Sequence, residues 1–245
     1  MSFQAVRKIK GIAEAFTKIP EGTDTTALLK GFAQDVAQWW SSMDYNRNSV
    51  ADESPWITFS AIRFLEGYLK PNMEVFEFGS GGSTLFFRKR VKHVTSIEHH
   101  REWFEVLSKH IKELPVKNTT LMLIEPEKDA APIPDSALSE PVLYRSSDGN
   151  YRTQSFRSYA SAIDRYEDGK FDLVTVDGRA RNSCFLHALK KVKVGGYLML
   201  DNSERNEYGP CFKEMQKLKW EKVSFTGLIP YTSLFSRTTF WKRTQ

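Results

Sequence analysis

The stretch "VFEFGSGGST", residues 75–84, places the carboxylate of Glu77 beside three glycines, Gly79, Gly81 and Gly82. Glycine adopts positive φ angles and lets the backbone pass close to a bound molecule. An apolar run that ends in such a turn is typical of a strand leaving an open α/β sheet, where these sheets bind ligands. The residues predict a ligand-binding turn, and the carboxylate favours a ligand with positive charge.

The turn departs from the dinucleotide fingerprint G-x-G-x-x-G, which would need a glycine at position 84. That position is Thr84, and Glu77 would place negative charge beside a pyrophosphate. A cationic ligand therefore fits better than a dinucleotide.

A second acid ends the next apolar run, "VTSIEHH", where Glu98 follows Glu77 by 21 positions. An acid at the end of the second strand is placed to accept hydrogen bonds from both hydroxyls of a ribose. His99 and His100 come next and would border the same site, with a solvated histidine pair as the alternative.

Further polar residues follow two later strands. In "FDLVTVDG", residues 171–178, the strand ends in Asp177, and Arg179 and Arg181 follow within four positions. "GGYLMLDN" ends with Asp201 and Asn202. Carboxylate and amide oxygens suit Mg²⁺. The guanidinium groups could instead pair with these carboxylates or bind an anionic substrate, and an Asp-Asn pair also commonly caps a turn. All three interpretations remain open.

Residues 75–83 resemble motif I of the class I S-adenosylmethionine-dependent methyltransferases, with Ser83 in place of the last glycine. The strand that ends at Asp177 is similar to the family's motif IV, and residues 192–204 are similar to its Gly-Gly turn and fifth strand. The resemblance spans roughly residues 57–242. It is specific for fold and cofactor and says little about the methyl acceptor.

The resemblance implies S-adenosylmethionine as the cofactor. The first acid and the glycines would shape its amino-acid end, Glu98 would hold the ribose, and Asp177 would border the transferred methyl, with Arg179 as the second catalytic candidate. The implied cofactor-binding residues are Glu77, Gly79, Ser80, Gly81, Gly82, Glu98, His99 and Asp177.

Asp177, Asp201 and Asn202 also resemble the magnesium ligands of the metal-dependent O-methyltransferases of the catechol and caffeoyl-CoA type. A magnesium ion there would draw a substrate hydroxyl toward the methyl donor.

The catalytic sites of two kinds of base methyltransferase are disfavoured. Cys211 lies too far beyond the fifth strand for a cytosine methyltransferase nucleophile, and no Asn/Asp-Pro-Pro-aromatic sequence for base amines follows the fourth strand.

Short apolar runs alternate with helical periods after residue 55, which predicts an α/β fold with a doubly wound, mostly parallel seven-stranded sheet of the Rossmann-like type. The last two strands should pair antiparallel, because their loop is too short for a crossover helix. The expected strands are 73–78, 93–98, 119–124, 171–176, 196–201, 220–225 and 234–241, and the expected helices 84–90, 101–113, 156–167, 182–192 and 209–218.

Residues 1–54 read as helical and predict an N-terminal helical cap, followed by a methyltransferase domain over 55–245. Asp52 to Pro55 predicts the start of a helix that Pro71 ends. Trp56 would close over the cofactor or pack in the core.

One segment, residues 126–155, has four prolines and no clean periodicity, which predicts a lid or a disordered insertion. Candidate substrate contacts in it are Tyr144, Arg145, Tyr151 and Arg152, and Glu125 just before it could face the adenine.

Composition sets the broad class. The 245 residues are 40% hydrophobic and 27% charged, which is ordinary for a globular protein. No apolar stretch approaches the ~20 residues that span a bilayer, and no apolar segment of a secretory signal follows the first lysines, so we expect a cytoplasmic protein. The two cysteines lack the Cys-x-x-Cys spacing of zinc or redox sites.

The net charge of +5 equals the excess of seven basic over two acidic residues in 213–245. A solvated face is the favoured explanation of this local excess, so nucleic acid is an unlikely partner.

We therefore expect methyl transfer from S-adenosylmethionine to an oxygen of a small-molecule acceptor, with an anionic acceptor and magnesium assistance as options. An NAD(P)-dependent oxidoreductase is a second hypothesis, disfavoured by Glu77 and Thr84. A noncatalytic binding or scaffold protein on the same fold is the third. The acceptor and the oligomeric state are not encoded in any recognisable pattern.

Overall fold

The computed structural model describes residues 3–128, 131 and 133–245. In this part of the chain, a seven-stranded sheet has the order β3-β2-β1-β6-β7-β9-β8. β1 pairs parallel with β2 and β6, while β9 pairs antiparallel with β7 and β8. The predicted fold class is therefore confirmed. The strands are β1 (Glu74–Phe78), β2 (His93–Glu98), β3 (Thr119–Leu123), β6 (Phe171–Val176), β7 (Val192–Leu200), β8 (Glu221–Leu228) and β9 (Phe235–Lys242).

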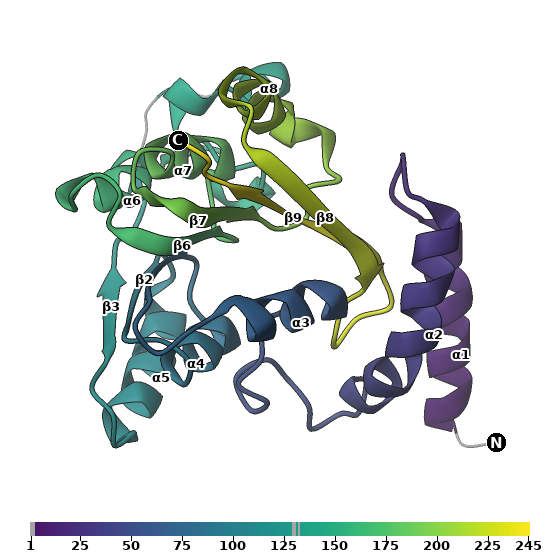
Figure 1. Cartoon of the computed structure of the whole chain (residues 1–245). Helices are drawn as coiled ribbons and strands as arrows, with labels where there is room; N and C mark the ends of the chain where they lie inside the picture. The colour runs from purple at the N-terminus through teal and green to yellow at the C-terminus, as the bar shows by residue number, and fades with distance from the viewer. Residues whose placement is uncertain (1–2, 129–130, 132) are drawn as a thin grey trace.

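Helices cover both faces of the sheet (Figure 1). One set lies below the sheet in this view and another above it, while α1 and α2 lie side by side beyond the end of the β8–β9 hairpin. The lower set is α3 (Phe59–Tyr68), α4 (Gly82–Arg88) and α5 (Arg101–Glu113); the upper is α6 (Arg157–Ala160), α7 (Arg181–Ala188) and α8 (Gly209–Leu218); the outer pair is α1 (Phe3–Thr17) and α2 (Thr25–Ser42).

Alternation along the strands divides the core into two clusters. Phe76 and Phe78 of β1 belong to the cluster that also holds Tyr159 and Phe185. Val75 faces the other way, into the cluster with Phe86 of α4. Successive strand residues point to opposite faces, so Glu77 shares the α4 side with Val75. A near-continuous apolar run is what a strand buried on both faces requires.

Several helix bounds differ from those predicted. The predicted helix 156–167 is α6 followed by a 3₁₀ segment, Ser161–Arg165. The predicted helix 182–192 ends at Ala188, because β7 already begins at Val192. Residues 189–191 form a turn in which the Lys190 and Lys191 carbonyl oxygens accept hydrogen bonds from the Gly169 and Phe171 N–H groups. Val192 then pairs with Phe171 at the start of the β6–β7 ladder.

The prediction that residues 1–54 are helical is wrong for the last part of that range. Residues 43–58 form turns and loop, with the Asn48 side chain accepting hydrogen bonds from the backbone of Val50 and Ala51. The next helix begins at Phe59, capped by the Thr58 hydroxyl, and not near Ser54. Local side-chain bonds of this kind compete with helix formation. Residues 1 and 2 lie outside the described part of the chain.

The segment 126–155 is folded wherever the structure describes it. Strand β4 (Glu127–Lys128) pairs antiparallel with β5 (Gln154–Ser155) and closes the segment at its base. Between them lie three 3₁₀ turns, Asp135–Ala137, Pro141–Leu143 and Gly149–Tyr151. Residues 129, 130 and 132 of this prediction lie outside the described residues.

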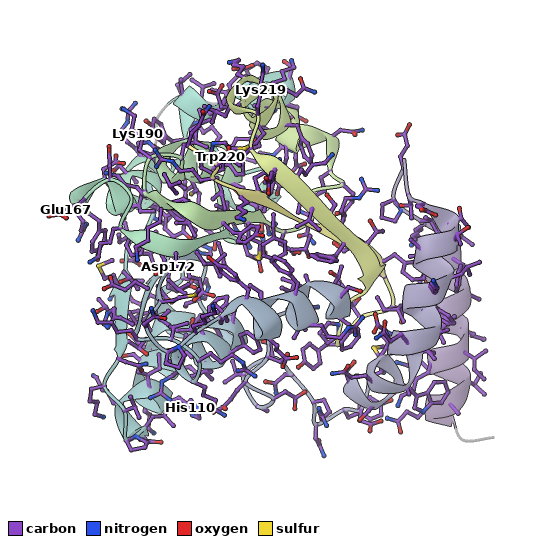
Figure 2. The ribbon with its side chains drawn as sticks, viewed as in Figure 1. His110, Glu167, Asp172, Lys190, Lys219 and Trp220 are labelled. Carbon is purple, nitrogen blue, oxygen red and sulfur yellow. The ribbon has the colours of Figure 1, made fainter. Side chains whose placement is uncertain are left out.

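The two ends of the strands differ in character. Figure 2 labels Asp172, near the amino end of β6, whose carboxylate accepts hydrogen bonds from the Glu74 N–H and the Lys193 ammonium group. Ion pairs of Lys92 and Lys170 with Glu74 also lie at that end. Among the described residues, no helix combines the length and apolar character needed to cross a membrane.

Candidate active site

A cavity of about 360 Å³ opens at the carboxyl ends of β1, β2 and β6. The strand order reverses between β1 and β6, because β2 and β3 lie on one side of β1, and β6 and β7 on the other. Open α/β sheets bind ligands at such a point. We call this space the switch-point cavity. It is lined by Ser49, Trp56, Gly79, Ser80, Gly81, Gly82, Ser83, Glu98, His99, His100, Trp103, Tyr151, Asp177, Gly178 and Arg179.

Two of the glycines are required by close contacts within the protein. Gly79 has a φ of +94°, and a Cβ there would lie 2.9 Å from the Cα of Gly178 in the turn after β6. A Cβ on Gly82 would lie 2.0 Å from the carbonyl oxygen of Ser49. At Gly81 a Cβ would meet only the Trp103 ring, at 3.8 Å. Gly81 is therefore the glycine with room to face a ligand.

Glu77 lies beneath the turn and not on the cavity wall. It is 1% exposed, and its Oε2 accepts hydrogen bonds from the hydroxyls of Thr84 (2.6 Å) and Ser96 (2.5 Å). Thr84 in turn accepts a hydrogen bond from the Gly81 N–H at 3.0 Å. Burial raises the pKa of Glu77 to about 7, against hydrogen bonds from Ser83, Ser96 and Thr84. Glu77 and Thr84 together fix the shape of the turn.

Glu98 presents a fixed carboxylate to the cavity. Its Oε2 accepts hydrogen bonds from the Ser80 N–H (3.1 Å) and hydroxyl (2.9 Å). Its Oε1 accepts from the backbone N–H groups of His99 (2.8 Å) and His100 (2.9 Å). Burial raises the pKa of Glu98, but hydrogen bonds from His99, His100 and Ser80 outweigh it, so the pKa lies below its usual value. The group is an oriented anion at neutral pH.

Aromatic side chains border this carboxylate. Trp103 donates its ring N–H to the Ser80 carbonyl oxygen at 2.9 Å. The His99 ring Nε2 lies 3.1 Å from the hydroxyl of Tyr151, which reaches in from the 126–155 segment. Trp56, from the loop before α3, also lines the cavity and is 51% exposed. This part of the cavity thus combines the fixed charge of Glu98 with flat aromatic walls, which suits a nucleoside.

Arg181 lies among the residues predicted to bind magnesium. Its Nη2 is 2.9 Å from Asp177 Oδ1. Its Nη1 donates to the Asp201 carbonyl oxygen at 2.7 Å and to Asn202 Oδ1 at 3.2 Å. With its side chain only 8% exposed, Arg181 fills this space from within the protein.

The Asp201 carboxyl group is equally unsuited to a metal ion. Its Oδ1 accepts a hydrogen bond from the Thr238 hydroxyl at 2.7 Å. Burial, and next the charge of Asp177, raise the pKa of Asp201 to about 8. A magnesium site needs ionised carboxylate oxygens that are free to coordinate.

The magnesium prediction for Asp177, Asp201 and Asn202 is therefore corrected, because these residues do not fit the ion. Arg181 occupies the place that the ion would take, and its guanidinium is the counter-charge of Asp177. The described residues contain no cluster of three or more His, Cys, Asp or Glu placed to hold a metal ion.

Arg179 separates the switch-point cavity from a second cavity and lines both. Its Nη2 lies 3.0 Å from Asp148 Oδ2, and its guanidinium lies over the Tyr151 ring, 5.6 Å from the centroid. Its Nε is buried and has no hydrogen-bond partner in the described structure.

Comparison with known proteins gives matches among solved structures. No family model matches the chain, and no curated protein does. The crystal structure of an rRNA methylase from Streptococcus thermophilus superposes with a TM-score of 0.51 at 14% identity, covering 78% of this chain and 98% of that one. The chain has the Rossmann-like methyltransferase fold.

Two further matches have lower scores. A putative methyltransferase from Streptococcus mutans in complex with SAH has a TM-score of 0.48 at 12% identity, covering 74% of this chain and 94% of that one. A methyltransferase-like protein from Silicibacter pomeroyi has a TM-score of 0.45 at 22% identity, with coverages of 76% and 86%.

Most of the predicted site residues meet on this methyltransferase fold at one cavity: Gly79, Ser80, Gly81, Gly82, Glu98, His99, Asp177 and Arg179 all line it. Glu77, Asp201 and Asn202 do not. Trp103 was missed, because one tryptophan in an amphipathic helix gives no signal beyond packing. Ser49 was missed because it comes from a turn that the sequence suggested to be helical.

Proposed function

We propose that the protein transfers a methyl group from S-adenosylmethionine to an oxygen of a small-molecule acceptor. The observation that carries the proposal is Glu98, a buried carboxylate held by four hydrogen-bond donors at the wall of the switch-point cavity. An acid at the end of the second strand is placed to accept the hydroxyls of a ribose.

The residues of the cavity fit the parts of this cofactor. Glu98 would accept the ribose hydroxyls, with the Ser80 hydroxyl rotating away to make room. The Ser80–Ser83 turn, with Ser49 behind it, would hold the amino-acid end. An adjoining cavity of about 340 Å³, lined in part by His100, Glu125 and Gln154, would take the adenine.

Charge at the cavity also suits a sulfonium. The negative charge comes from Glu98 and Asp177, which line the cavity, and less from Glu77, which is buried below the turn with a pKa of about 7. When bound, the cofactor supplies an electrophilic methyl group on a positively charged sulfur. Asp177 lies on the wall where β6 ends, with the adjoining second cavity open to an acceptor.

Asp177 and Arg179 would act on the acceptor. Asp177 would accept the proton of a hydroxyl acceptor as the acceptor oxygen takes the methyl group that bound S-adenosylmethionine would supply, and the sulfur would keep the electron pair of the broken C–S bond. Burial raises the pKa of Asp177 against the opposing charges of Arg181, Arg205 and Arg179, which favours the proton transfer. Alignment of acceptor and methyl carbon supplies the rest of the rate. We propose this chemistry without a magnesium ion among Asp177, Asp201 and Asn202.

Calorimetric titration tests the cofactor. We expect S-adenosylmethionine and SAH to bind with one site per chain, and NAD(P) to bind weakly or not at all. Tighter binding of NAD(P) would support the oxidoreductase hypothesis and refute ours. Binding of SAH without methyl transfer to any member of an acceptor panel would support a noncatalytic protein.

An RNA acceptor is the second candidate. The matched Streptococcus thermophilus structure is described as an rRNA methylase, and residues 213–245 carry seven basic and two acidic side chains. A tritiated methyl group appearing in RNA, and not in small molecules, would decide for this candidate.

A further inference from the structure

A second cavity of about 490 Å³ adjoins the switch-point cavity and shares Gly178 and Arg179 with it. We call it the arginine cavity, because Arg145, Arg179, Arg181 and Arg205 all line it. Three loops and a helix start form its walls: the 138–148 part of the 126–155 segment, the turn after β6, the turn after β7, and the first residues of α7.

Guanidinium groups dominate the charge of the arginine cavity. The acids in its lining are Asp148 and Glu207. Arg181 is committed to Asp177 and to the backbone, and Glu207 accepts a hydrogen bond from the Ser147 hydroxyl at 2.6 Å. Arg145 donates to the backbone carbonyl oxygens of Gln154 and Ala131. The remaining positive charge next to the shared wall therefore belongs mainly to Arg179 and Arg205.

Arg179 has a donor that the protein does not use. One terminal nitrogen contacts Asp148, but the buried Nε has no acceptor among the residues described. A buried N–H without a partner is unfavourable by more than a typical hydrogen bond contributes. An acceptor atom of a ligand at the shared wall would satisfy it once the partly exposed Arg179 side chain turns to bring the Nε to the cavity surface.

Arg205 supplies a second cation. It lies on the exposed loop after β7 and forms no ion pair in the described part of the chain. Its charge is close enough to Asp177 to oppose the rise in that carboxyl's pKa. Two guanidinium groups that flank one opening can bind an oxyanion through paired N–H groups.

We propose that the arginine cavity binds an oxyanion group, phosphate or carboxylate, of a small-molecule methyl acceptor through Arg179 and Arg205. That the bound molecule is a methyl acceptor rests on the proposed function. The oxyanion specifies the chemical class of this acceptor. The volume lies within the range of small-molecule sites, roughly 300 to 1,000 Å³. The lining is polar and lacks the row of exposed aromatic platforms with which proteins bind single-stranded nucleic acid.

The test is a titration of the full-length chain with inorganic phosphate and, separately, acetate. NMR spectra that correlate each arginine Nε with its proton report the binding. We expect a saturable shift of the Arg179 Nε–H signal, and about tenfold or more weaker binding in Arg205→Gln, as for the loss of a charged hydrogen bond. Arg165→Gln, an exposed arginine elsewhere on the surface, is the matched control and should bind like the wild type.

The same samples are titrated with SAH, so that failure of the two proposals can be told apart. The inference is supported if Arg205→Gln binds SAH as tightly as the wild type does but binds phosphate or acetate more weakly. The anion that binds the wild type more tightly identifies the group. SAH binding with no saturable anion binding, or with equal anion binding in Arg205→Gln, overturns it and leaves the proposed function standing. Anion binding without SAH binding supports the oxyanion site and refutes the proposed function.

RNA is a separate arm of the experiment. Binding of a short single-stranded RNA that depends on Arg205, while phosphate and acetate do not bind, would overturn the assignment to a small molecule.

Discussion

At the scale of single residues, Glu98 shows how a site is prepared before its ligand binds. Four donors from Ser80, His99 and His100 hold the carboxylate in one orientation. The side chain would therefore lose little conformational freedom on binding the proposed ribose, which would increase affinity. Glu77, by contrast, acts through Thr84 on the shape of the turn.

Replacing Glu98 tests the proposed ribose contact. In Glu98→Ala we expect SAH affinity to fall by about 1.5 to 3 kcal/mol, the range for hydrogen bonds to a charged group. Calorimetry measures the affinity, and thermal melting checks that the variant folds. Glu98→Gln keeps the shape, and Glu105→Ala removes an exposed carboxylate of α5 as control. Unchanged SAH affinity in a folded Glu98→Ala protein would refute the site.

Asp201 predicts a pH dependence of stability. Its folded pKa of about 8 lies above the ordinary value of 3.8. Between these values the folded state holds a proton that the unfolded state has released, so the free energy of unfolding falls as pH rises, by at most about 1.4 kcal/mol per pH unit. Asp201→Asn keeps the acceptor for Thr238 and removes this titration.

We therefore expect Asp201→Asn to be more stable than the wild type at pH 8, and the difference to shrink toward pH 5. Urea denaturation across this range measures it, with Glu140→Gln as a control for the loss of an exposed carboxylate. If the free energies of unfolding of the wild type and Asp201→Asn differ by the same amount at every pH, Asp201 is ionised in the folded protein.

At the scale of elements, the glycine turn joins three segments. It connects β1 to α4, lies against the turn after β6 at Gly79, and receives the Ser49–Ser54 turn at Gly82. The motif therefore serves packing as much as ligand binding. The 126–155 segment gains its order in the same way, from β4–β5 pairing and from contacts such as Asn182 Nδ2 with the Ser139 carbonyl oxygen.

Gly82→Ala tests the packing role. Its Cβ would meet the backbone of Ser49 at 2.0 Å, so we expect a loss of about 1 to 3 kcal/mol in the free energy of unfolding, as for other overpacked sites. Gly31→Ala in α2 is the matched control: nothing lies within 4 Å of its Cβ. It should gain roughly 0.5 to 1 kcal/mol, since alanine favours a helix. Equal stability of the two variants would exclude a close approach at Gly82.

At the scale of the whole molecule, the outer helices share a core with the sheet. Trp39 of α2 is fully buried and donates its ring N–H to the Thr232 carbonyl oxygen in the β8–β9 loop at 2.7 Å. Leu28 and Phe235 belong to the same cluster. We propose that residues 1–54 are a cap on the methyltransferase fold, and the shared core implies that cap and sheet unfold together.

The tertiary arrangement of β6, α7 and β7 also decides the metal question. It brings Arg181 among Asp177, Asp201 and Asn202, where it pairs with the Asp177 carboxylate and donates to the Asp201 carbonyl oxygen and to Asn202 Oδ1. We therefore expect methyl transfer, measured with a competent acceptor, to survive dialysis against EDTA with less than a twofold change. Loss of activity on chelation and its return with Mg²⁺ would show that a magnesium ion displaces Arg181.

The amino-acid sequence by itself determined the sheet and the location of the site. Both follow from local patterns: apolar runs end in Gly79, Glu98 and Asp177, and parallel strands bring their carboxyl ends to one edge. The sequence also named Tyr151 and Arg145 as candidates without placing them, because a proline-rich segment has no periodicity to read.

Only the tertiary structure decided which polar groups face the ligand. Glu77 and Asp201 look like site acids in the sequence, yet the side-to-side alternation of the strands and contacts with Thr84 and Thr238 bury them. Arg181 could pair with a substrate or with Asp177, and the fold selects Asp177. Strand patterns depend on near neighbours in the chain, whereas the charge balance of a cavity depends on side chains from distant segments. That balance is set when the segments pack.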